Sequence, residues 1–430
     1  MKLSDIKKVH FIGIGGIGMS GLARLFLHEG KEVSGSDRAP SPITEALMEE
    51  GVTFFSSQIA SNITPGIEMV VYTEAMAADH EEMIAARALN VPMMNYFEAL
   101  GLVANEYYLI AVSGAHGKTT TTAMLIDILE GAGLDPSAIV GSLRATTKSN
   151  YRAGKSKYFI AEACEYKRDF LSLTPDVLII TNVEHEHVDY YKDLRAVQEA
   201  FREFAGQVRE DGVIIVNFGG ENIAPILEGI HAGIIDYGKY FDPTLKLKVP
   251  GLHNQMNAAA ATAAAQIVGV EPLRSKQALE NFTGTWRRFE YKGELNGAKV
   301  YDDYGHHPTE IRATLQGARE LYPDKKITIV FQAHTYTRTH ELFDDFVDAL
   351  AEADHVIVVP IYAAREENVS GVTHTKLVTA IQEKNPSALA LDTFDEVIRD
   401  ITDTVGDTDV VLVMGAGDVT RIASELTKTA

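Results

Sequence analysis

The stretch AVSGAHGKTTTTAMLIDILE, residues 111–130, places a glycine-rich loop between a run typical of a strand and a run typical of a helix. The usual phosphate loop has the spacing G-x-x-x-x-G-K-[ST]. Counting back from Gly117, that spacing requires glycine at position 112, but the chain has Val112 there and glycine at Gly114. Amides at a helix start still can cradle phosphates, and Lys118 can still reach the outer phosphate oxygens. We interpret the stretch as a shorter phosphate loop, in preference to a glycine turn with a surface lysine.

Candidate metal ligands follow the neighbouring strand-like runs. Thr119 offers a hydroxyl oxygen to Mg²⁺, and a hard ion needs further oxygen or nitrogen ligands. Glu162 ends the run YFIAEA, and His187 follows the run DVLIITNVE. Because parallel strands end at one edge of a sheet, we expect both side chains near the loop. Weaker candidates for the same role are Glu165, His185, Glu186 and Asp189.

Composition limits the class of protein. The chain has 430 residues, which is enough for two to three domains, and it carries a net charge of −21, which argues against nucleic-acid binding. Its single cysteine, Cys164, excludes an intrachain disulfide framework and fits a cytoplasmic location. No apolar run approaches the ~18 residues of a membrane span, so no membrane insertion is expected.

Strand-like and helix-like runs alternate along most of the chain, which predicts the α/β class with parallel sheets. Three glycine-containing openings, VHFIGIGG, YYLIAVSGAHGK and AKVYDDYGHHP, each follow or contain a strand-like run. We therefore expect three domains, 1–103, 104–283 and 284–430. The alanine-rich stretch from Asn257 predicts a closely packed helix.

The first opening has the spacing of a dinucleotide-binding fold. Gly13, Gly15 and Gly18 form G-x-G-x-x-G between a strand-like and a helix-like run, and Asp37 closes the next strand. Such glycines let the backbone approach a pyrophosphate, and the acidic residue can hold a ribose hydroxyl. The pattern fits NAD or a UDP-sugar, or a strand–helix turn without a ligand. The expected binding residues are Gly13, Gly15, Gly16, Ile17, Gly18 and Asp37.

Two nucleotide-type loops in one chain favour a ligase that joins a UDP-linked acid to an amine using ATP. A nicotinamide-dependent oxidoreductase leaves the Lys118 loop unused, and a simple ATPase leaves the first loop unused. The chain resembles the Mur ligase family over nearly its whole length. The motifs that carry the resemblance are HFIGIGGIGMSGLA, GAHGKTTTT, TNVEHEHVDYY, GLHNQMNAAAA, RRFEYKG, DDYGHHPTEI, FQAHTYTRT and MGAG.

The resemblance implies a Rossmann-like UDP-binding domain, a central ATPase-type domain and a C-terminal Rossmann-like domain for the amino acid. It implies that ATP is bound by Gly114, Ala115, His116, Gly117, Lys118, Thr119, Thr120, His253, Asn254, Asn257, Arg288 and Asp303. It places the amino acid near Tyr304, His306, His334 and Arg338, with Lys118, His306 and Arg338 as catalytic candidates. It implies magnesium at Thr119, Glu162 and His187. The histidine next in sequence, His307, is interpreted as structural.

The amino-acid site departs from the family pattern. Position 335, where the family has an arginine, holds Thr335, so Arg338 is the remaining fork for a carboxylate. Arg365 follows the strand-like run HVIVVPI, which we expect to neighbour KITIVFQ. Arg365 could therefore restore the missing charge, or it could pair with Glu366 or Glu367 on the surface.

The expected substrates are UDP-N-acetylmuramate and L-alanine, joined through an acyl phosphate for peptidoglycan synthesis. A recycling ligase that attaches a whole tripeptide to the same UDP-sugar is the alternative within the family, and the loop GIGGIGMSG favours the alanine branch. A non-catalytic UDP-sugar sensor is disfavoured by Lys118, Thr119, Glu162 and His187. The expected state is a monomer or a homodimer.

Overall fold

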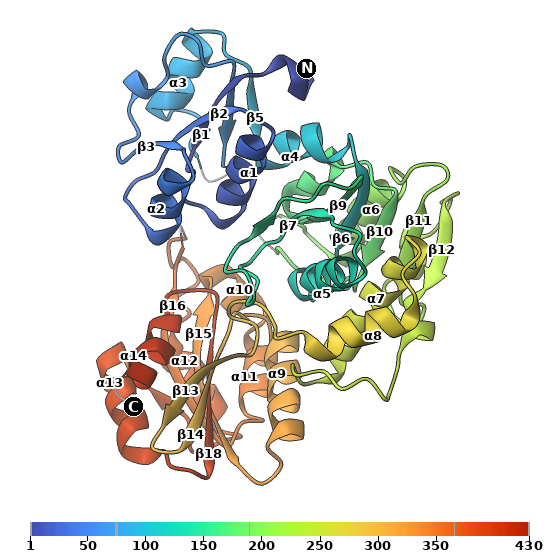
Figure 1. Ribbon diagram of the computed structural model, residues 1–430. Coiled ribbons are helices and arrows are strands. Elements are labelled where there is room, and N and C mark those ends of the chain that lie inside the picture. Colours follow the sequence, from blue (N-terminus) through green and yellow to red (C-terminus); the bar gives the residue numbers. More distant parts are fainter. Residues whose placement is uncertain (1, 74–75, 189, 365, 429–430) are drawn as a thin grey trace. The chain divides into compact units, whose positions relative to one another are not determined.

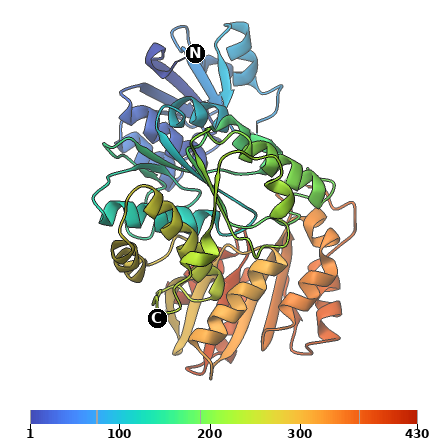
Figure 2. The same ribbon diagram turned by 90° about the vertical axis from the view of Figure 1, so that its right-hand side faces the viewer.

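The structure, a computed structural model, describes residues 2–73, 76–188, 190–364 and 366–428 (Figures 1 and 2). Its strands form three sheets. The contacts divide the chain into two compact units. The first unit comprises Met1–Glu184, Val197–Asp242 and Asn257–Leu279, and the second comprises His185–Ala196, Pro243–Met256 and Glu280–Ala430.

The first sheet has five strands in the order β3-β2-β1-β4-β5, all parallel. The central strand β1 is buried from its second residue onward, as expected for a parallel strand covered on both faces. The elements of this part are β1 (Lys8–Ile12), α1 (Ile17–His28), β2 (Glu32–Ser36), α2 (Pro42–Glu49), β3 (Thr53–Phe55), β4 (Met69–Tyr72), α3 (Glu81–Ala88), β5 (Met93–Asn95) and α4 (Tyr96–Ala104).

The second sheet has the order β12-β11-β10-β6-β9-β7-β8, with β8 antiparallel at one end. Its elements are β6 (Tyr108–Ser113), α5 (Lys118–Gly131), β7 (Ser137–Ile139), β8 (Tyr151–Arg152), β9 (Tyr158–Glu162), β10 (Val177–Ile180), α6 (Leu194–Ala205), β11 (Val213–Val216) and β12 (Gly233–Asp236). The predicted alanine-rich helix is confirmed as part of α7 (Leu252–Ile267), which α8 (Pro272–Asn281) follows. Most of its alanines are fully buried, so small side chains allow close packing there.

The third sheet has the order β13-β14-β18-β15-β16-β17, with only β13 antiparallel among these strands. Its elements are β13 (Glu290–Leu295), β14 (Ala298–Asp303), α9 (Pro308–Leu321), β15 (Lys326–His334), α10 (Tyr336–Glu341), α11 (Phe343–Leu350), β16 (His355–Tyr362), α12 (His374–Gln382), β17 (Leu389–Ala390), α13 (Phe394–Thr404), β18 (Asp409–Met414) and α14 (Thr420–Lys428). One core packs α9, α11 and α12 on one face, and a second core packs α13 and α14 on the other (Figures 1 and 2).

The predicted α/β class with three mainly parallel sheets is confirmed. The predicted pairing of KITIVFQ with HVIVVPI is also confirmed, because β15 and β16 are parallel neighbours. The domain boundaries near residues 103 and 284 stay a prediction, because the contacts group the first two sheets into one unit. Among the described helices, none is long and apolar enough to cross a membrane.

Within the first unit, Asn150 fixes helix α1 against the second sheet. Asn150 lies just before β8, and its Nδ2 donates a hydrogen bond to the carbonyl oxygen of Ile17. Arg24, on the next turns of α1, donates to Asn150 Oδ1 at 3.2 Å. A β-carbon added at Gly21 would lie only 2.8 Å from Asn150 Nδ2. The glycine at position 21 therefore leaves room for the contact between Asn150 and α1.

A second close approach, at Gly101 of α4, gives a test of this packing. A β-carbon at Gly101 would clash with the carbonyl oxygen of Ser172, whereas one at Gly131 would make an ordinary 3.6 Å contact with Ala278. We expect Gly101→Ala to destabilise the fold by about 1–3 kcal/mol through overpacking. Gly131→Ala is the matched control, and it should be neutral or stabilising by roughly 0.5–1 kcal/mol. Thermal and urea unfolding measure both, and equal midpoints for the two variants would contradict the close contact.

Candidate active site

The Lys118 loop is built around two glycines that have no room for a side chain. Gly114 has φ 134° and Gly117 has φ 83°, both outside the range that other residues readily adopt. A β-carbon at Gly114 would clash with Thr181 Oγ1, and one at Gly117 would clash with Asn257 Oδ1. The segment after β10 therefore packs directly against the loop, and Asn257, expected near ATP, contacts it as well.

The segment after β10 also holds the loop through hydrogen bonds. Asn182 accepts from the His116 amide at 2.8 Å through its side-chain oxygen, and its Nδ2 donates to the His116 carbonyl at 2.9 Å. The Asn182 carbonyl accepts from the Ala115 amide at 3.2 Å. Glu184 Oε2 lies 3.5 Å from His116 Nε2. The backbone of the loop is thus held at a defined position in front of helix α5.

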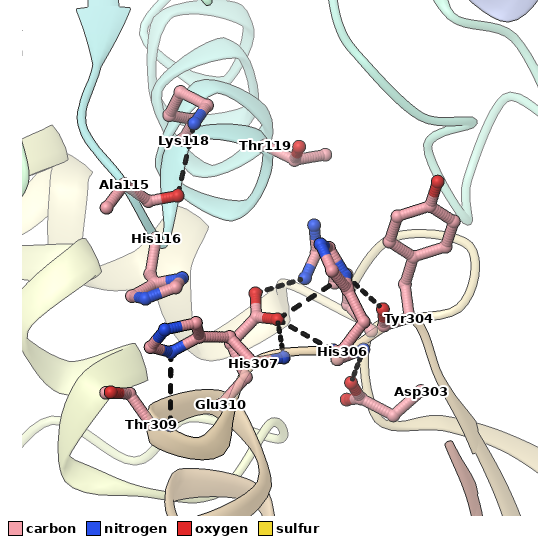
Figure 3. Close-up of polar contacts among 12 residues, drawn as sticks. Ala115, His116, Lys118, Thr119, Asp303, Tyr304, His306, His307, Thr309 and Glu310 are labelled. Atoms are coloured by element: carbon pink, nitrogen blue, oxygen red, sulfur yellow. Dashed lines mark hydrogen bonds and ion pairs between the residues drawn. The ribbon is translucent and has the colours of Figure 1, made fainter. Parts of the chain in front are cut away.

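Lys118 is turned back onto its own loop and onto a carboxylate. Its Nζ donates to the carbonyl oxygen of Gly114 at 2.5 Å. It also donates to the carbonyl oxygen of Ala115 at 3.1 Å (Figure 3). It also contacts both carboxylate oxygens of Glu165, at 3.0 and 3.2 Å. Burial alone would lower the pKa of Lys118, but Glu165, Cys164 and Glu162 together outweigh it and the pKa stands above its usual value. Lys118 is therefore a fully charged ammonium at the phosphate loop.

Glu162 and Thr119 meet at the end of β9. Thr119 Oγ1 donates to Glu162 Oε1 at 2.9 Å, and the amide of Gly141 donates to Glu162 Oε2 at 2.8 Å. The first unit thus brings together two of the three predicted metal ligands. A hydroxyl and a carboxylate oxygen beside a phosphate loop are the donors that Mg²⁺ prefers, so the residues fit that ion.

The third predicted ligand, His187, belongs to the segment of the second unit that starts at His185. Its backbone has φ 54°, and its carbonyl accepts from the amides of Tyr190 and Tyr191 at 2.8 and 2.9 Å. These two hydrogen bonds hold the His187 carbonyl. Its metal role stays a prediction.

The first glycine loop is held by the end of β2. The Ser36 carbonyl accepts from the amides of Gly13 and Ile14 at 2.9 and 3.0 Å, and Gly13 has φ 83°. Asp37 Oδ2 accepts from the Gly15 amide at 2.8 Å. Asp37, which is predicted to hold a ribose hydroxyl, therefore contacts the glycine loop itself, shortly before α1 begins at Ile17.

The residues expected near the amino acid lie together in the second unit. The rings of Tyr304 and His306 meet edge to face with centroids 5.6 Å apart, and those of His306 and His334 are 5.9 Å apart. Arg338 donates to the His334 carbonyl at 2.6 Å and to Glu186 Oε2 at 3.2 Å. The structure thus places Arg338, the predicted anchor for the carboxylate of the amino acid, beside these aromatic rings. Its guanidinium already pairs with the carboxylate of Glu186.

Asp303 and Arg288 lie on either side of Tyr304. Asp303 accepts from the amides of Gly305 and Phe289 at 2.6 and 2.8 Å, and burial raises its pKa to about 6. The guanidinium of Arg288 lies over the Tyr304 ring at 5.4 Å. The two residues expected to approach ATP from the last domain are therefore neighbours.

The start of helix α7 carries the other residues expected near ATP. Asn254 donates to the Pro250 carbonyl at 2.7 Å. Burial lowers the pKa of His253 to about 4, so this imidazole is neutral at pH 7. A β-carbon at Gly251 would lie 2.6 Å from the His253 ring, so the turn before the helix packs on it. His253 and Asn254 belong to the second unit and Asn257 to the first.

With this geometry, the comparisons with known proteins decide the family. Family descriptions match as the Mur ligase catalytic domain over residues 8–108, the middle domain over 112–242 and the glutamate ligase domain over 287–417. A UDP-N-acetylmuramate–L-alanine ligase of Agathobacter rectalis is 41% identical over 98% of this chain and 97% of its own. One of Clostridium tetani is 40% identical over 97% of each. The chain belongs to the Mur ligase family.

Solved structures agree with this assignment. A UDP-N-acetylmuramate–alanine ligase of Thermotoga maritima superposes with a TM-score of 0.82, at 28% identity and 98% coverage of both chains. A murein peptide ligase of Psychrobacter arcticus gives 0.71, at 25% identity and the same coverage. The resemblance drawn from the motifs is therefore confirmed at the level of the family.

Four polar residues of this Mur ligase were given no place in the expected site, or only a minor one. Glu165 and Glu186 were weak metal candidates, yet they lie on Lys118 and Arg338. Asn182 follows β10, and its bonds to the loop have no sequence signature. Glu310 accepts from the amides of His306 and His307 at 2.8 and 3.2 Å (Figure 3). The spacing His307-Pro-Thr-Glu310, a capping box, could have indicated the last of these.

His307 caps helix α9, because its Nδ1 accepts from the Thr309 amide at 3.3 Å. Its Nε2 lies 3.7 Å from Glu186 Oε1. Thr335 and Thr337 both donate to the carboxylate of Glu366. Arg365 lies outside the described residues, so its role in binding the amino acid stays a prediction.

The pH dependence of stability tests the buried state of His306. Burial lowers the pKa of His306 from 6.5 to about 4, and its Nδ1 lies 3.0 Å from the Tyr304 carbonyl. Between these pH values His306 takes up a proton more readily in the unfolded chain than in the folded chain. The free energy of unfolding therefore falls as pH falls from 6.5 towards 4. His306→Gln should therefore melt with a weaker pH dependence between pH 7 and 5 than the wild type. His231→Gln, at an exposed position, is the control, and an unchanged slope in His306→Gln would contradict the prediction.

Proposed function

We propose that the chain is an ATP-dependent, ADP-forming ligase that joins the carboxylate of UDP-N-acetylmuramate to the amino group of L-alanine in peptidoglycan precursor synthesis. The observation that carries the proposal is the presence of two glycine loops in one unit, at the starts of α1 and α5. Relatives that are 37–41% identical over nearly the whole chain are named as ligases for these two substrates. The proposed location is the cytoplasm, as a monomer or a homodimer.

The first loop holds the UDP group, and the second holds the ATP phosphates. A carboxylate is a poor acyl donor, so the γ-phosphoryl group is first transferred to it to give an acyl phosphate, and the amine then displaces phosphate. Lys118 supplies a fixed positive charge beside the transferring group, and the amides at the start of α5 donate hydrogen bonds to its oxygens. His116 is held by Asn182, so the loop keeps its shape as charge moves.

Thr119, Glu162 and His187 would hold Mg²⁺. When bound, the ion would neutralise phosphate charge and orient the phosphoryl group. Glu162 is oriented for this by hydrogen bonds from Thr119 and Gly141. The Gly141 contact leaves the Glu162 carboxylate with a preferred direction before any ion binds.

The second unit holds L-alanine through Arg338, whose planar fork suits a carboxylate. His306 is neutral at pH 7, because burial lowers its pKa to about 4. Its Nδ1 faces the Tyr304 carbonyl at 3.0 Å, so the hydrogen belongs on Nδ1 and Nε2 is left as an acceptor. His306 can therefore orient the incoming amine by accepting a hydrogen bond from it.

A recycling ligase for a whole tripeptide is the second candidate. The observation in its favour is Thr335, which stands where the family has an arginine, although the TM-score with the murein peptide ligase, 0.71, is lower than the 0.82 with the alanine ligase. Phosphate release from UDP-N-acetylmuramate, ATP and Mg²⁺ tests both, with each amino acid and the tripeptide supplied separately. We expect release with L-alanine. Release with the tripeptide alone would support the second candidate, and no release with any acceptor would overturn the ligase assignment.

The two loops should be separable by mutation. Lys118→Ala should abolish ligation and leave the affinity for UDP-N-acetylmuramate nearly unchanged, because Lys118 begins α5 and the UDP loop begins α1. Calorimetry with the UDP-substrate and with ATP measures the two affinities. Lys155→Ala, which removes an exposed lysine of the same unit, is the control and should retain activity. Equal loss of both affinities in Lys118→Ala would contradict the two-site arrangement.

A further inference from the structure

Tyr96 begins helix α4, and its position is fixed by a helix cap. The side chain of Asn95 accepts from the Glu98 amide at 2.8 Å, and Glu98 accepts from the Asn95 amide at 2.8 Å. This reciprocal pair satisfies the first amides of the helix and sets the direction in which the chain enters it. Tyr96 therefore projects from a rigid helix start.

The phenol of Tyr96 lies against the first glycine loop. A β-carbon at Gly18 would lie 3.2 Å from both Cε2 and Cζ of Tyr96 and 3.5 Å from its hydroxyl oxygen. Gly18 is the third glycine of G-x-G-x-x-G, and it lies in the first turn of α1. The hydroxyl end of the ring, rather than its base, is therefore next to the predicted UDP site.

The Tyr96 hydroxyl is protonated at neutral pH. Burial raises the pKa of Tyr96, and the charges of Glu162 and Cys164 raise it further, so the hydroxyl keeps its hydrogen at neutral pH. Glu162 is the residue that contacts Thr119 at the phosphate loop. Within the described part of the chain, no residue forms a hydrogen bond with the Tyr96 hydroxyl. A partly buried hydroxyl without a protein partner is an available hydrogen-bond donor beside the first glycine loop.

We propose that the Tyr96 hydroxyl donates a hydrogen bond to the muramyl group of the UDP-substrate. The inference rests on the proposed function, which requires the substrate to extend from the first glycine loop, at its pyrophosphate, to the Lys118 loop, at its carboxylate. The sugar with its lactyl ether is the part that spans this distance. A β-carbon at Gly18 would lie 3.5 Å from the Tyr96 hydroxyl, so the hydroxyl lies at the end of that span next to the first loop.

The alternative is that Tyr96 only packs against Gly18 and Phe97, whose ring meets it edge to face at 4.7 Å. Tyr96→Phe separates the two roles, because it keeps the ring on Gly18 and removes only the hydroxyl. Tyr107→Phe is a matched control. Its hydroxyl donates to Glu29 at 3.0 Å within the same unit, and it has no assigned part in binding.

Calorimetric titration with UDP-N-acetylmuramate and with UDP tests the proposal. We expect Tyr96→Phe to bind UDP-N-acetylmuramate about 3- to 10-fold more weakly, which corresponds to the loss of one hydrogen bond. Its affinity for UDP should be unchanged. In steady-state assays the KM for the UDP-substrate should rise by a similar factor, with the KM values for ATP and L-alanine unchanged. Tyr107→Phe should bind both ligands as the wild type does.

Two results would overturn the assignment. Unchanged affinity of Tyr96→Phe for UDP-N-acetylmuramate would show that the hydrogen bond does not exist. An equal loss of affinity for UDP would show that the residue acts by shaping the glycine loop. Failure of the wild-type protein to bind UDP-N-acetylmuramate at all would instead overturn the proposed function, and this assignment with it. Melting temperatures of the two variants identify any loss that comes from misfolding.

Discussion

The Lys118 loop depends on the absence of side chains at Gly114 and Gly117. A β-carbon at either position would meet Thr181 or Asn257, so the segment after β10 and the helix α7 can approach the loop only because both residues are glycine. The close approach then allows the side chain of Asn182 to hydrogen-bond both the amide and the carbonyl of His116. The loop is shorter than the usual phosphate loop, and these contacts from outside supply the rigidity that its own length does not.

The cations proposed to bind anionic groups already contact carboxylates of the chain. Lys118 contacts Glu165, and Arg338 contacts Glu186. A buried cation without a partner is costly, so an internal carboxylate stabilises each one. The free energy gained when a phosphate or carboxylate binds is therefore only the difference between the new ion pair and the internal one. Affinity for the correct ligand must then come from the shape of the site and from neutral donors, such as the loop amides.

Local pattern was enough to predict the elements and their ends, because each depends on residues close in sequence. Glycine spacing located both loops, and two apolar runs predicted the adjacent strands β15 and β16. The carboxylates on the cations could not be predicted in the same way. Glu165 is 47 residues from Lys118, and Glu186 is 152 residues from Arg338. With 60 acidic residues in the chain, no local signal distinguishes these two from the rest.

A carboxylate of the chain also binds a neutral donor of the first loop, because Asp37 accepts a hydrogen bond from the Gly15 amide. An isolated anion that approaches the Gly15 amide meets the Asp37 carboxylate there, and the repulsion between like charges opposes its binding. A ligand that also contacts several other groups can offset that cost, whereas a free phosphate cannot. In this acidic chain, with its net charge of −21, such carboxylates therefore oppose the binding of anions that make only one contact.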